Sequence, residues 1–542
     1  MSVLNPEQKP EVKFQPDVWR SFQKGAHQIV DAVIPTLGPR PRLVALERTH
    51  RSDSPELLDD AGQIARRIIQ IRNRDEDVGA MFVRQMLWRL REDVGDGAAT
   101  AAVLFKAVYD EAIKYLTADG NAMRLRVGLE KALDVALRAL DEQVQPLGGR
   151  EQIASFARSI CPDESVTDLL GEIFDIIGAE GQLDIHLGRS NLSEREYVEG
   201  HLWEGGLLTR NLMLEPLRQR SYLENTAVLI TDLEIESASQ LTPALRAALQ
   251  GGEKSLLLVA RKLSDEAAAL LTMVNRDSKQ MRVTAAKTPG TGMADQSAAL
   301  DDLCAVAGGR AFIQAAGQTL ENISAEHFGH ARRVWADMER LVIVNGKGDP
   351  RLLRQHIETL QRGIEKADTP EQRNKLRERV GRLLGGAAVL SVGGVTETEM
   401  KTRRELAERA ALTLRSALRV GVVNGGGIAL LDCRPALNKL SKQIADEDEQ
   451  AALRILAKAL DAPARAILTN SGFDPSSYTP HWGRGRGVDA RTGQVVDMHS
   501  AGILDSAASV RGALNSAVRS AALALTVDVV VHKRNPQASV NP

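Results

Sequence analysis

Residues 384–430 read LGGAAVLSVGGVTETEMKTRRELAERAALTLRSALRVGVVNGGGIAL. The run AAVLSV follows two glycines and is short and apolar, which predicts a buried strand. Residues 397–419 carry apolar and charged side chains at helical spacing and predict one long helix. A short apolar run and the glycines 425–427 come next, and three successive glycines predict a turn. The stretch therefore predicts the order strand, helix and glycine turn.

The chain before this stretch alternates short apolar runs with helical segments, from about residue 199 to residue 345. The expected strands are residues 226–231, 255–260, 281–285 and 340–344, and the expected helices are about 240–250, 264–276 and 296–307. Strands that alternate with helices predict an α/β domain with a largely parallel sheet.

Residues 350–384 predict a pair of charged helices. Leu353, Ile357, Leu360 and Ile364 recur at helical spacing in the first half. The sequence Thr369-Pro370-Glu371-Gln372 then forms a capping box with proline at the first helical position. A two-helix hairpin packed on its own domain is favoured over a long coiled coil.

Both ends of the chain are rich in alanine and predict helices. The expected N-terminal elements are helices over residues 14–34, 60–91, 98–117 and 121–143 and a short strand over 42–47, and helices are expected from the glycine turn to about residue 525. A chain of 542 residues predicts about three domains. Because the two ends resemble each other and differ from the middle, we expect one α/β domain to be inserted into a helical domain.

The composition excludes several classes of protein. The 69 basic and 71 acidic residues nearly cancel, which argues against a nucleic-acid or membrane-surface protein. Cys161, Cys304 and Cys433 are far apart in sequence and form no metal knuckle or redox pair, so a reducing compartment is expected. The polar start predicts no signal peptide, and no apolar run is long enough to span a membrane. A cytoplasmic location is therefore expected.

Three glycine turns could hold phosphate: Thr36-Leu37-Gly38-Pro39, Gly95-Asp96-Gly97 and Gly425-Gly426-Gly427. The second leads directly into a predicted helix, whose first N–H groups can bind an anion. An aspartate in such a turn can hold Mg²⁺ together with phosphate oxygens. The alternative is that each is simply a tight turn, and the absence of a GxxxxGK[ST] motif excludes a P-loop.

The order of motifs resembles the group I chaperonins, the bacterial GroEL family. The motifs are TLGP, GDGxxTA, LLGGAAVLSVGGxTExEMK, GVVNGGGIAL and AGILDS, and the resemblance runs from about residue 13 to about residue 533. It implies a mostly helical equatorial ATP-binding domain, a small intermediate hinge domain and an inserted α/β apical domain. The implied boundaries are 1–142 with 420–542, 143–198 with 387–419, and 199–386, respectively.

The resemblance also implies which residues contact ATP and its metal ions. The matching positions are Thr36, Leu37, Gly38, Pro39, Gly95, Asp96, Gly97, Thr100, Gly426, Ile503 and Asp505. Asp96 matches a Mg²⁺ ligand, and K⁺ is an alternative second cation. Asp60 matches an aspartate near the γ-phosphate and the attacking water, although Ala61 replaces the glycine that follows it in the family.

Two departures from the family pattern predict altered chemistry. Ala98 and Ala99 replace hydroxyl residues beside the phosphates, and each lost hydrogen bond to a charged group weakens binding by about 1.5–3 kcal/mol. Arg409 stands where the family has its catalytic aspartate, and a guanidinium cannot act as a base. The hypothesis is that nucleotide binding is retained but weakened and hydrolysis is impaired; the alternative is slow hydrolysis through Asp60, with Arg409 only in a helix salt bridge.

The family binds client polypeptides on apolar apical side chains. The matching large apolar residues are Leu207, Leu212, Leu245, Met273 and Val274. The alternative for each is an ordinary core position. The expected protein is a subunit of a homo-oligomeric ring, heptameric or double heptameric, that binds non-native or specific client proteins. A co-chaperonin lid or the subunits of an intact chaperonin are candidate partners, and the other hypothesis is a non-catalytic ring or filament scaffold.

Overall fold

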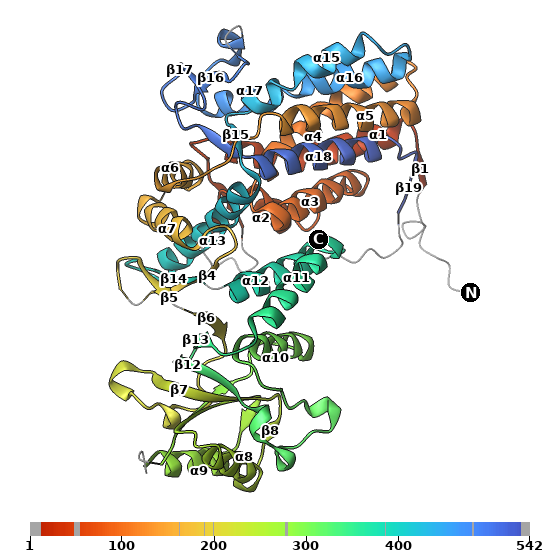
Figure 1. The fold of residues 1–542 in the computed structure, drawn as a ribbon. Coiled ribbons are helices and arrows are strands. Elements are labelled where there is room, and N and C mark those ends of the chain that lie inside the picture. Colours follow the sequence, from red (N-terminus) through yellow and green to blue (C-terminus); the bar gives the residue numbers. More distant parts are fainter. Residues whose placement is uncertain are drawn as a thin grey trace, which may run out of the picture. The chain divides into compact units, whose positions relative to one another are not determined.

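The computed structural model describes residues 12–47, 55–161, 163–188, 190–198, 200–276, 280–384, 386–479 and 482–532. The chain forms two compact units (Figure 1). Unit 1 comprises Met1–Asp175 and Lys401–Pro542, and unit 2 comprises Ile176–Met400. The second unit is therefore inserted into the first. The finer division into three domains stays a prediction.

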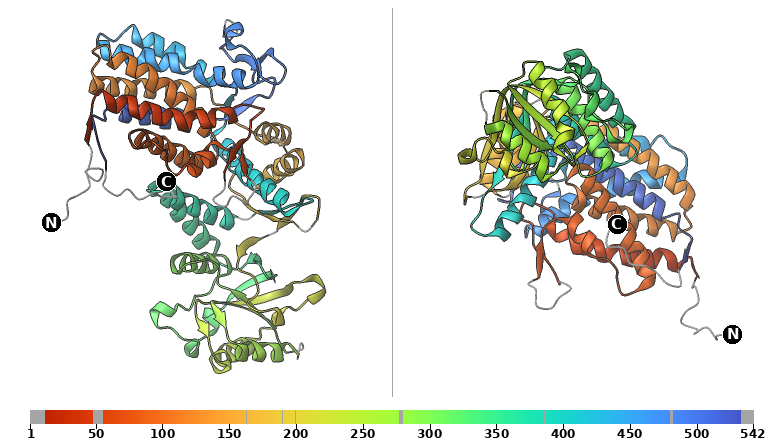
Figure 2. Two further views of the ribbon diagram at one scale, coloured as in Figure 1. Left: turned by 180° about the vertical axis from the view of Figure 1, so that it is seen from behind. Right: turned by 90° about the horizontal axis from the view of Figure 1, so that it is seen from below.

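Unit 1 consists mainly of long helices that lie side by side (Figures 1 and 2). Its helices are α1 (Asp17–Val33), α2 (Ala61–Arg67), α3 (Arg74–Val94), α4 (Ala98–Leu116), α5 (Ala122–Asp141), α6 (Arg150–Ile160), α14 (Ile428–Leu431), α15 (Arg434–Ser441), α16 (Glu447–Ala459), α17 (Ala462–Asn470) and α18 (Ala507–Ala524). Two more, α7 (Glu164–Ile177) and α13 (Glu397–Val420), cross the boundary between the units. The alanine-rich helices α4 and α18 pack closely because alanine adds little bulk between them.

The crossing of α1 and α3 depends on two glycines. A Cβ at Gly25 would lie 1.7 Å from the carbonyl oxygen of Glu76, and a Cβ at Gly79 would lie 2.2 Å from that of Phe22. No side chain can occupy such a position without moving the backbone. The small residues in the amphipathic pattern of these helices therefore determine how closely the two helices approach.

The predicted helices of unit 1 are largely confirmed, with two differences. The helix expected over residues 60–91 is interrupted, because the side chain of Asn73 accepts the N–H of Asp75 and begins α3 anew. The region expected to be helical to residue 525 also contains a hairpin of β16 (Arg486–Asp489) and β17 (Gln494–Asp497). Further along, β18 (Leu504–Ser506) pairs with β15 (Val422–Asn424).

Unit 2 is built around a six-stranded sheet of order β11-β9-β7-β12-β13-β6. These strands are β6 (His201–Glu204), β7 (Ser221–Ile230), β9 (Ser255–Ala260), β11 (Arg282–Lys287), β12 (Gly329–Ala336) and β13 (Arg340–Gly346). The strands β7, β9 and β11 are parallel, and the other three pairings are antiparallel. The expectation of a largely parallel sheet is therefore wrong for half of it. The antiparallel half contains β6 and β12, which were not among the expected strands. A tight turn joins β12 to β13, and in it the carboxylate of Asp337 accepts the N–H groups of Glu339 and Arg340.

Helices cover both faces of this sheet. On one face, α8 (Ala238–Gln250) and α9 (Asp265–Arg276) contribute Leu241 and Leu271 to the core. On the other face lie α10 (Met293–Ala307) and the hairpin of α11 (Pro350–Lys366) and α12 (Pro370–Leu384). The predicted helical hairpin is confirmed.

The stretch that begins at residue 384 also folds as predicted. The run AAVLSV is β14 (Ala387–Val392), which pairs in parallel with β4 (Gln182–Leu187) and antiparallel with β5 (Glu194–Val198). The helix that follows it is α13, and the glycines 425–427 form a turn. No helix in the described part of the chain is long and apolar enough to cross a membrane.

Candidate functional site

Four charged side chains of unit 1 form what we call the Asp60 cluster: Asp59, Asp60, Arg91 and Arg409. Asp60 is the N-cap of α2, where its Oδ1 accepts the N–H of Gln63 at 2.8 Å. Arg91 comes from the last turn of α3, and Arg409 comes from the middle of α13. The cluster therefore joins the consecutive helices α2 and α3 to α13, which is far from them in sequence.

The carboxylate of Asp60 is fully engaged. Arg91 Nε lies 3.1 Å from Oδ1 and 3.0 Å from Oδ2. Arg409 Nη1 lies 3.4 Å from Oδ2 of Asp60 and 3.3 Å from Oδ1 of Asp59. A carboxylate has about four acceptor positions, and here each oxygen of Asp60 has two partners. Asp60 therefore has no vacant acceptor position for a water molecule while both arginines hold it.

Arg91 is fixed by its surroundings. A Cβ at Gly62 would lie 2.6 Å from Cδ of Arg91, so the glycine lets the arginine pass close to α2. Its guanidinium also lies 5.3 Å from the ring centre of Trp88, and Arg66 lies 4.3 Å from the same ring. Such cation–π contacts contribute about 0.5–1 kcal/mol at exposed sites. Neither Arg91 nor Asp59 was identified from the sequence: Arg91 belongs to no recognisable motif, and Asp59, which directly precedes Asp60, was given no role.

The Gly95-Asp96-Gly97 turn lies between two helices. Both glycines have positive φ, of 83° and 90°. A Cβ at Gly95 would lie 2.9 Å from Cβ of Leu412 in α13, and a Cβ at Gly97 would lie 2.9 Å from the carbonyl oxygen of Ser509 in α18. The helix α4 begins directly after the turn, so its first N–H groups lack intrahelical partners. Thr100 lies half-buried in this first turn.

Asp96 is exposed to solvent in the turn between α3 and α4. Desolvation by the surrounding protein nevertheless raises the pKa of its carboxylate. The N–H of Gly97 and the charge of Arg409 lower this pKa, whereas Asp60 raises it. Asp96 therefore senses the charges of the Asp60 cluster.

Asp505 belongs to the same group of charges. It lies on β18, where it pairs with Val423 of β15. Desolvation, followed by the charge of Asp96, raises the pKa of Asp505 to about 7. The structure therefore brings together four of the predicted positions, namely Asp60, Asp96, Asp505 and Arg409.

The turn Thr36–Pro39 packs against α17. Asn470 Nδ2 donates to the carbonyl oxygen of Leu37 at 2.8 Å. Gly38 has a φ of 116°, and a Cβ there would lie 3.5 Å from Ile467. The hydroxyl of the threonine is engaged with a backbone carbonyl of α1, and the proline is exposed. The N–H of Leu37 also donates to the carbonyl oxygen of Ile34 at 3.0 Å, so both polar backbone groups of Leu37 are engaged within the protein.

The turn Gly425–Gly427 packs against the same helix. A Cβ at Gly427 would lie 2.8 Å from the backbone nitrogen of Ala464 in α17. The N–H of Gly425 donates to the carbonyl oxygen of Ile503 at 2.9 Å, which is two residues from Asp505. A Cβ at Gly426 would lie 2.9 Å from Met498. The third glycine turn thus bonds to the segment just before β18, and β18 carries Asp505, whose pKa responds to Asp96 of the second turn.

The match with known proteins covers nearly the whole chain. A model of the TCP-1/cpn60 chaperonin family matches residues 29–535. The chain belongs to this family. Its fold is similar to that of the chaperonin gp146 from bacteriophage EL 2 (Pseudomonas aeruginosa), whose structure was determined in the presence of ATP-BeFx. In crystal form I of gp146 the TM-score is 0.69 at 17% identity, covering 96% of this chain and 99% of that chain. In form II the TM-score is 0.62 at 16% identity, covering 96% and 98%. The predicted chaperonin fold is confirmed.

Asp96 is the metal ligand that the sequence predicts. Among the described residues, no group of three or more His, Cys, Asp or Glu side chains is placed to hold a metal ion. Asp59 and Asp60 are engaged by arginine. Mg²⁺ binds to one or two carboxylates when phosphate oxygens and waters complete its shell. Asp96 therefore fits a divalent ion only in the company of a bound phosphate.

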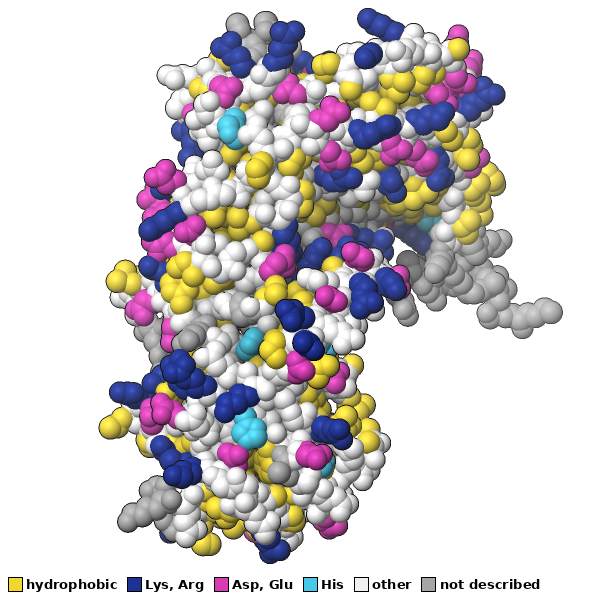
Figure 3. Space-filling view, in the orientation of Figure 1, with side chains coloured by type: hydrophobic (Ala, Val, Ile, Leu, Met, Phe, Trp, Pro, Cys, Tyr) yellow, Lys and Arg dark blue, Asp and Glu magenta, His cyan; other side chains and the backbone are white. Residues whose placement is uncertain are grey.

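The apical positions matched to client binding fall into two groups. Leu207, Leu212 and Leu245 are only 4%, 0% and 8% exposed, so for these three residues the core alternative holds. They pack on the six-stranded sheet with its helices. Met273 on α9 is 61% exposed, and Val274 is half-buried beside it. On the face drawn in Figure 3, hydrophobic side chains of unit 2 lie in small groups between polar ones.

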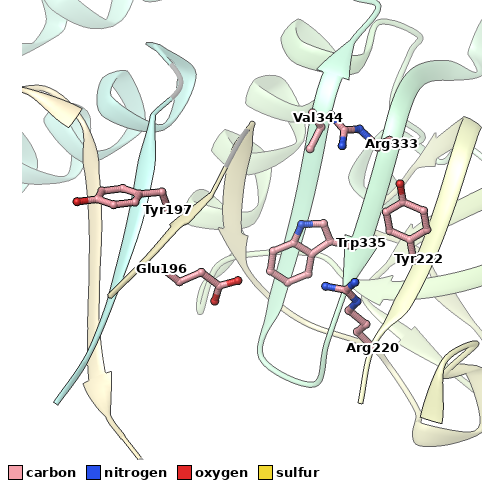
Figure 4. A pocket seen from close by; sticks show the side chains of 7 residues that line it. All are labelled: Glu196, Tyr197, Arg220, Tyr222, Arg333, Trp335 and Val344. Carbon is pink, nitrogen blue, oxygen red and sulfur yellow. The ribbon is translucent and has the colours of Figure 1, made fainter. Parts of the chain in front are cut away.

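Unit 2 also contains a recess of about 110 Å³ that sequence reasoning did not identify (Figure 4). It is lined by Glu196, Tyr197, Arg220, Tyr222, Arg333, Trp335 and Val344. The glutamate of β5 is directed toward Trp335 and Arg220, whereas the hydroxyl of Tyr197 points away. Arg220 is paired with Glu215 at 3.5 Å and lies 5.9 Å from the ring centre of Tyr222. The recess therefore lies between β5 and the six-stranded sheet, and Arg220 is already engaged by neighbouring side chains.

The raised pKa of Asp505 predicts that the stability of unit 1 falls as the pH rises. The folded protein keeps the proton up to about pH 7, whereas the unfolded chain loses it near the ordinary aspartate pKa of 3.8. Stability is therefore lost between these values as pH increases. A plot of the melting temperature against pH from 5 to 8 should show this decline, and Asp505→Asn should flatten it.

Asp497→Asn provides the control for this measurement. The N–H of Ser500 lowers the pKa of Asp497, so its titration lies below that pH range and its removal should leave the slope unchanged. An equal decline in wild type and Asp505→Asn would show that another group is responsible.

Proposed function

We propose that this chain is a chaperonin ring subunit that binds nucleotide, hydrolyses it slowly and captures non-native polypeptides. The observation that carries the proposal is the ion pairing of Arg409 with Asp59 and Asp60 beside the glycine turn of Asp96. The nucleotide would be ATP; Asp96 is the carboxylate at which Mg²⁺ would bind if a divalent ion accompanies the nucleotide, and K⁺ is an alternative second cation. The proposed location is the cytoplasm.

The chemistry of the cluster favours binding over hydrolysis. Free helix N–H groups at α4 and a guanidinium at residue 409 both favour phosphate. Neither group can take a proton from water. Glu408, the nearest acid on α13, is paired with Arg404 at 3.2 Å, and Asp60 is held by both arginines. Loss of a general base typically costs about 10²–10⁴ in rate.

The direct test is steady-state phosphate release by the purified protein, together with electron microscopy with and without ATP. We expect closed rings, which in the family have seven members, and phosphate release far slower than that of an ordinary chaperonin. Turnover comparable to an ordinary chaperonin would contradict the proposal. Rings that change shape on adding ATP would support nucleotide binding without fast turnover.

Client capture is expected to depend on the exposed surface of α8 and α9. Met273 is 61% exposed there, and Leu249 is 46% exposed on α8. Burial of a methionine side chain contributes about 1.5–3 kcal/mol, so Met273→Lys should weaken capture of a denatured client by about tenfold or more. The measurement is suppression of client aggregation at increasing chaperonin concentration.

Met293→Lys is the matched control, because Met293 is 81% exposed at the start of α10 in the same unit. It should capture client as the wild type does. Equal losses in both variants would indicate a nonspecific effect of charge.

The second candidate is a non-catalytic ring or filament scaffold that assembles alone or with an intact chaperonin. The burial of Leu207, Leu212 and Leu245 favours it, because few large apolar side chains remain for clients. A scaffold should form the same rings but neither suppress aggregation nor respond to a co-chaperonin. Aggregation suppression that Met273→Lys abolishes would exclude the scaffold.

A further inference from the structure

The nucleotide site proposed above contains its own cations. The carboxylates of Asp59, Asp60, Asp96 and Asp505 are accompanied by the guanidinium groups of Arg91 and Arg409. A nucleoside triphosphate adds further negative charge, which must be balanced before it can bind tightly. In such a site, the balance comes either from an added metal ion or from the protein itself.

Arg409 is held loosely enough to change partner. Its two contacts, of 3.3 and 3.4 Å, exceed the usual 2.7–2.9 Å of a charge-assisted hydrogen bond. Both contacts use Nη1, and among the described residues no hydrogen bond is made by Nε or Nη2 of Arg409. By contrast, Arg379 in unit 2 grips Asp302 through two nitrogens at 2.7 and 3.0 Å. The N–H groups at Nε and Nη2 of Arg409 can therefore donate to a ligand.

Arg91 keeps Asp60 paired when Arg409 changes partner. It contacts both oxygens of Asp60 and is fixed between Gly62 and Trp88, so Asp60 stays paired if Arg409 turns away. Burial lowers the pKa of Arg409, but Asp59 and Asp60 outweigh this effect and keep the group charged. A charged guanidinium matches the geometry of phosphate with two parallel hydrogen bonds.

The same charge disfavours a divalent ion. Arg409 already lowers the pKa of Asp96, so its positive charge acts at the one carboxylate that would hold the metal. Like charges in a partly buried site repel by several kcal/mol at short range. The gain in affinity from adding Mg²⁺ is therefore small.

We propose that Arg409 is the counter-cation of the terminal phosphate, so that a nucleoside triphosphate binds to this chaperonin without a divalent ion. The inference rests on the proposed nucleotide site. Arg409 replaces the two links to Asp59 and Asp60 by hydrogen bonds to phosphate oxygens, while Arg91 retains Asp60.

The test is equilibrium binding of ATP and of AMP by calorimetry, in MgCl₂ and in EDTA at equal ionic strength. For the wild type we expect the ATP affinity in the two buffers to agree within about threefold, and ATP to bind at least about tenfold more tightly than AMP in EDTA. A loss of ATP affinity of more than about tenfold in EDTA overturns the inference. Failure of ATP to bind in either buffer overturns the proposed nucleotide site itself.

Variants identify the residue responsible. Arg409→Gln should lose about tenfold or more in ATP affinity in EDTA and regain part of it in MgCl₂, and Arg409→Lys should keep an intermediate affinity in EDTA. Arg404→Gln, which removes an exposed pair on the same helix, is the control and should bind as the wild type does. Binding in EDTA that Arg409→Gln leaves unchanged overturns the role of Arg409.

Discussion

Replacement of Arg409 by aspartate is expected to raise steady-state phosphate release by about 10²–10⁴-fold in the presence of Mg²⁺. The variant removes the guanidinium that occupies Oδ2 of Asp60 and places a carboxylate at the position where the family has its catalytic aspartate. One acceptor position of Asp60 becomes vacant, and the carboxylates of Asp60 and of residue 409 then both act on Asp96. The measurement is phosphate release at saturating ATP.

The metal dependence of the variant provides an internal check. The change leaves Asp59, Asp60, Asp96 and residue 409 all acidic, with Arg91 as the nearby cation, so Mg²⁺ should become essential. Arg404→Asp makes the same change of charge five residues earlier on α13, at an exposed pair with Glu408, and should stay at the wild-type rate. A folded Arg409→Asp ring that binds Mg²⁺-ATP and still releases phosphate at the wild-type rate would show that more than this side chain limits hydrolysis.

The order of elements could be predicted from the sequence where local pattern decides the structure. Helix α13 has clear helical periodicity, the strand AAVLSV is a short apolar run, and the capping box at residues 369–372 marks the start of α12. The hairpin of β16 and β17 was missed because its register depends on Gly493, with a φ of 76°, and on the Asp489 carboxylate that caps the turn. The antiparallel pairing of β12 with β13 was missed because it too depends on a turn capped by a carboxylate, that of Asp337.

The candidate site was predicted in part because its glycines and acids lie in motifs. What the sequence could not show is how the charges pair. Arg91 lies in an ordinary amphipathic helix, and its contact with Asp60 arises only because Gly62 lets it cross α2. For the apical residues the sequence cannot separate a core position from a binding surface, because both favour the same apolar side chains. Burial, which is decided by the whole sheet and its helices, places Leu245 inside and Met273 outside.

Replacement of Asp302 by alanine is expected to destabilise unit 2 by about 3–5 kcal/mol. Asp302 on α10 is 0% exposed and accepts hydrogen bonds from Arg379 at 2.7 and 3.0 Å and from His356 at 2.8 Å. Arg382 lies 4.0 Å from the same carboxylate, and burial lowers the pKa of Arg382 while Asp302 raises it. Without Asp302 these buried cations lose their counter-ion, and α10 loses its link to α11 and α12.

Hydrogen exchange localises the effect, because a chain of two units need not unfold in a single step. The amides of α11 and α12 should exchange at least about 100-fold faster in Asp302→Ala, while those of α4 and α18 in unit 1 should not change. Asp295→Ala is the control, since Asp295 on the same helix makes only an exposed pair with Lys375 at 3.4 Å, which contributes about 0–1 kcal/mol. The double variant Asp302→Ala with Arg379→Leu should recover part of the loss, because it removes a buried charge together with its partner. A double variant less stable than the sum of its single changes would instead show that Arg379 stabilises the helices through contacts other than Asp302.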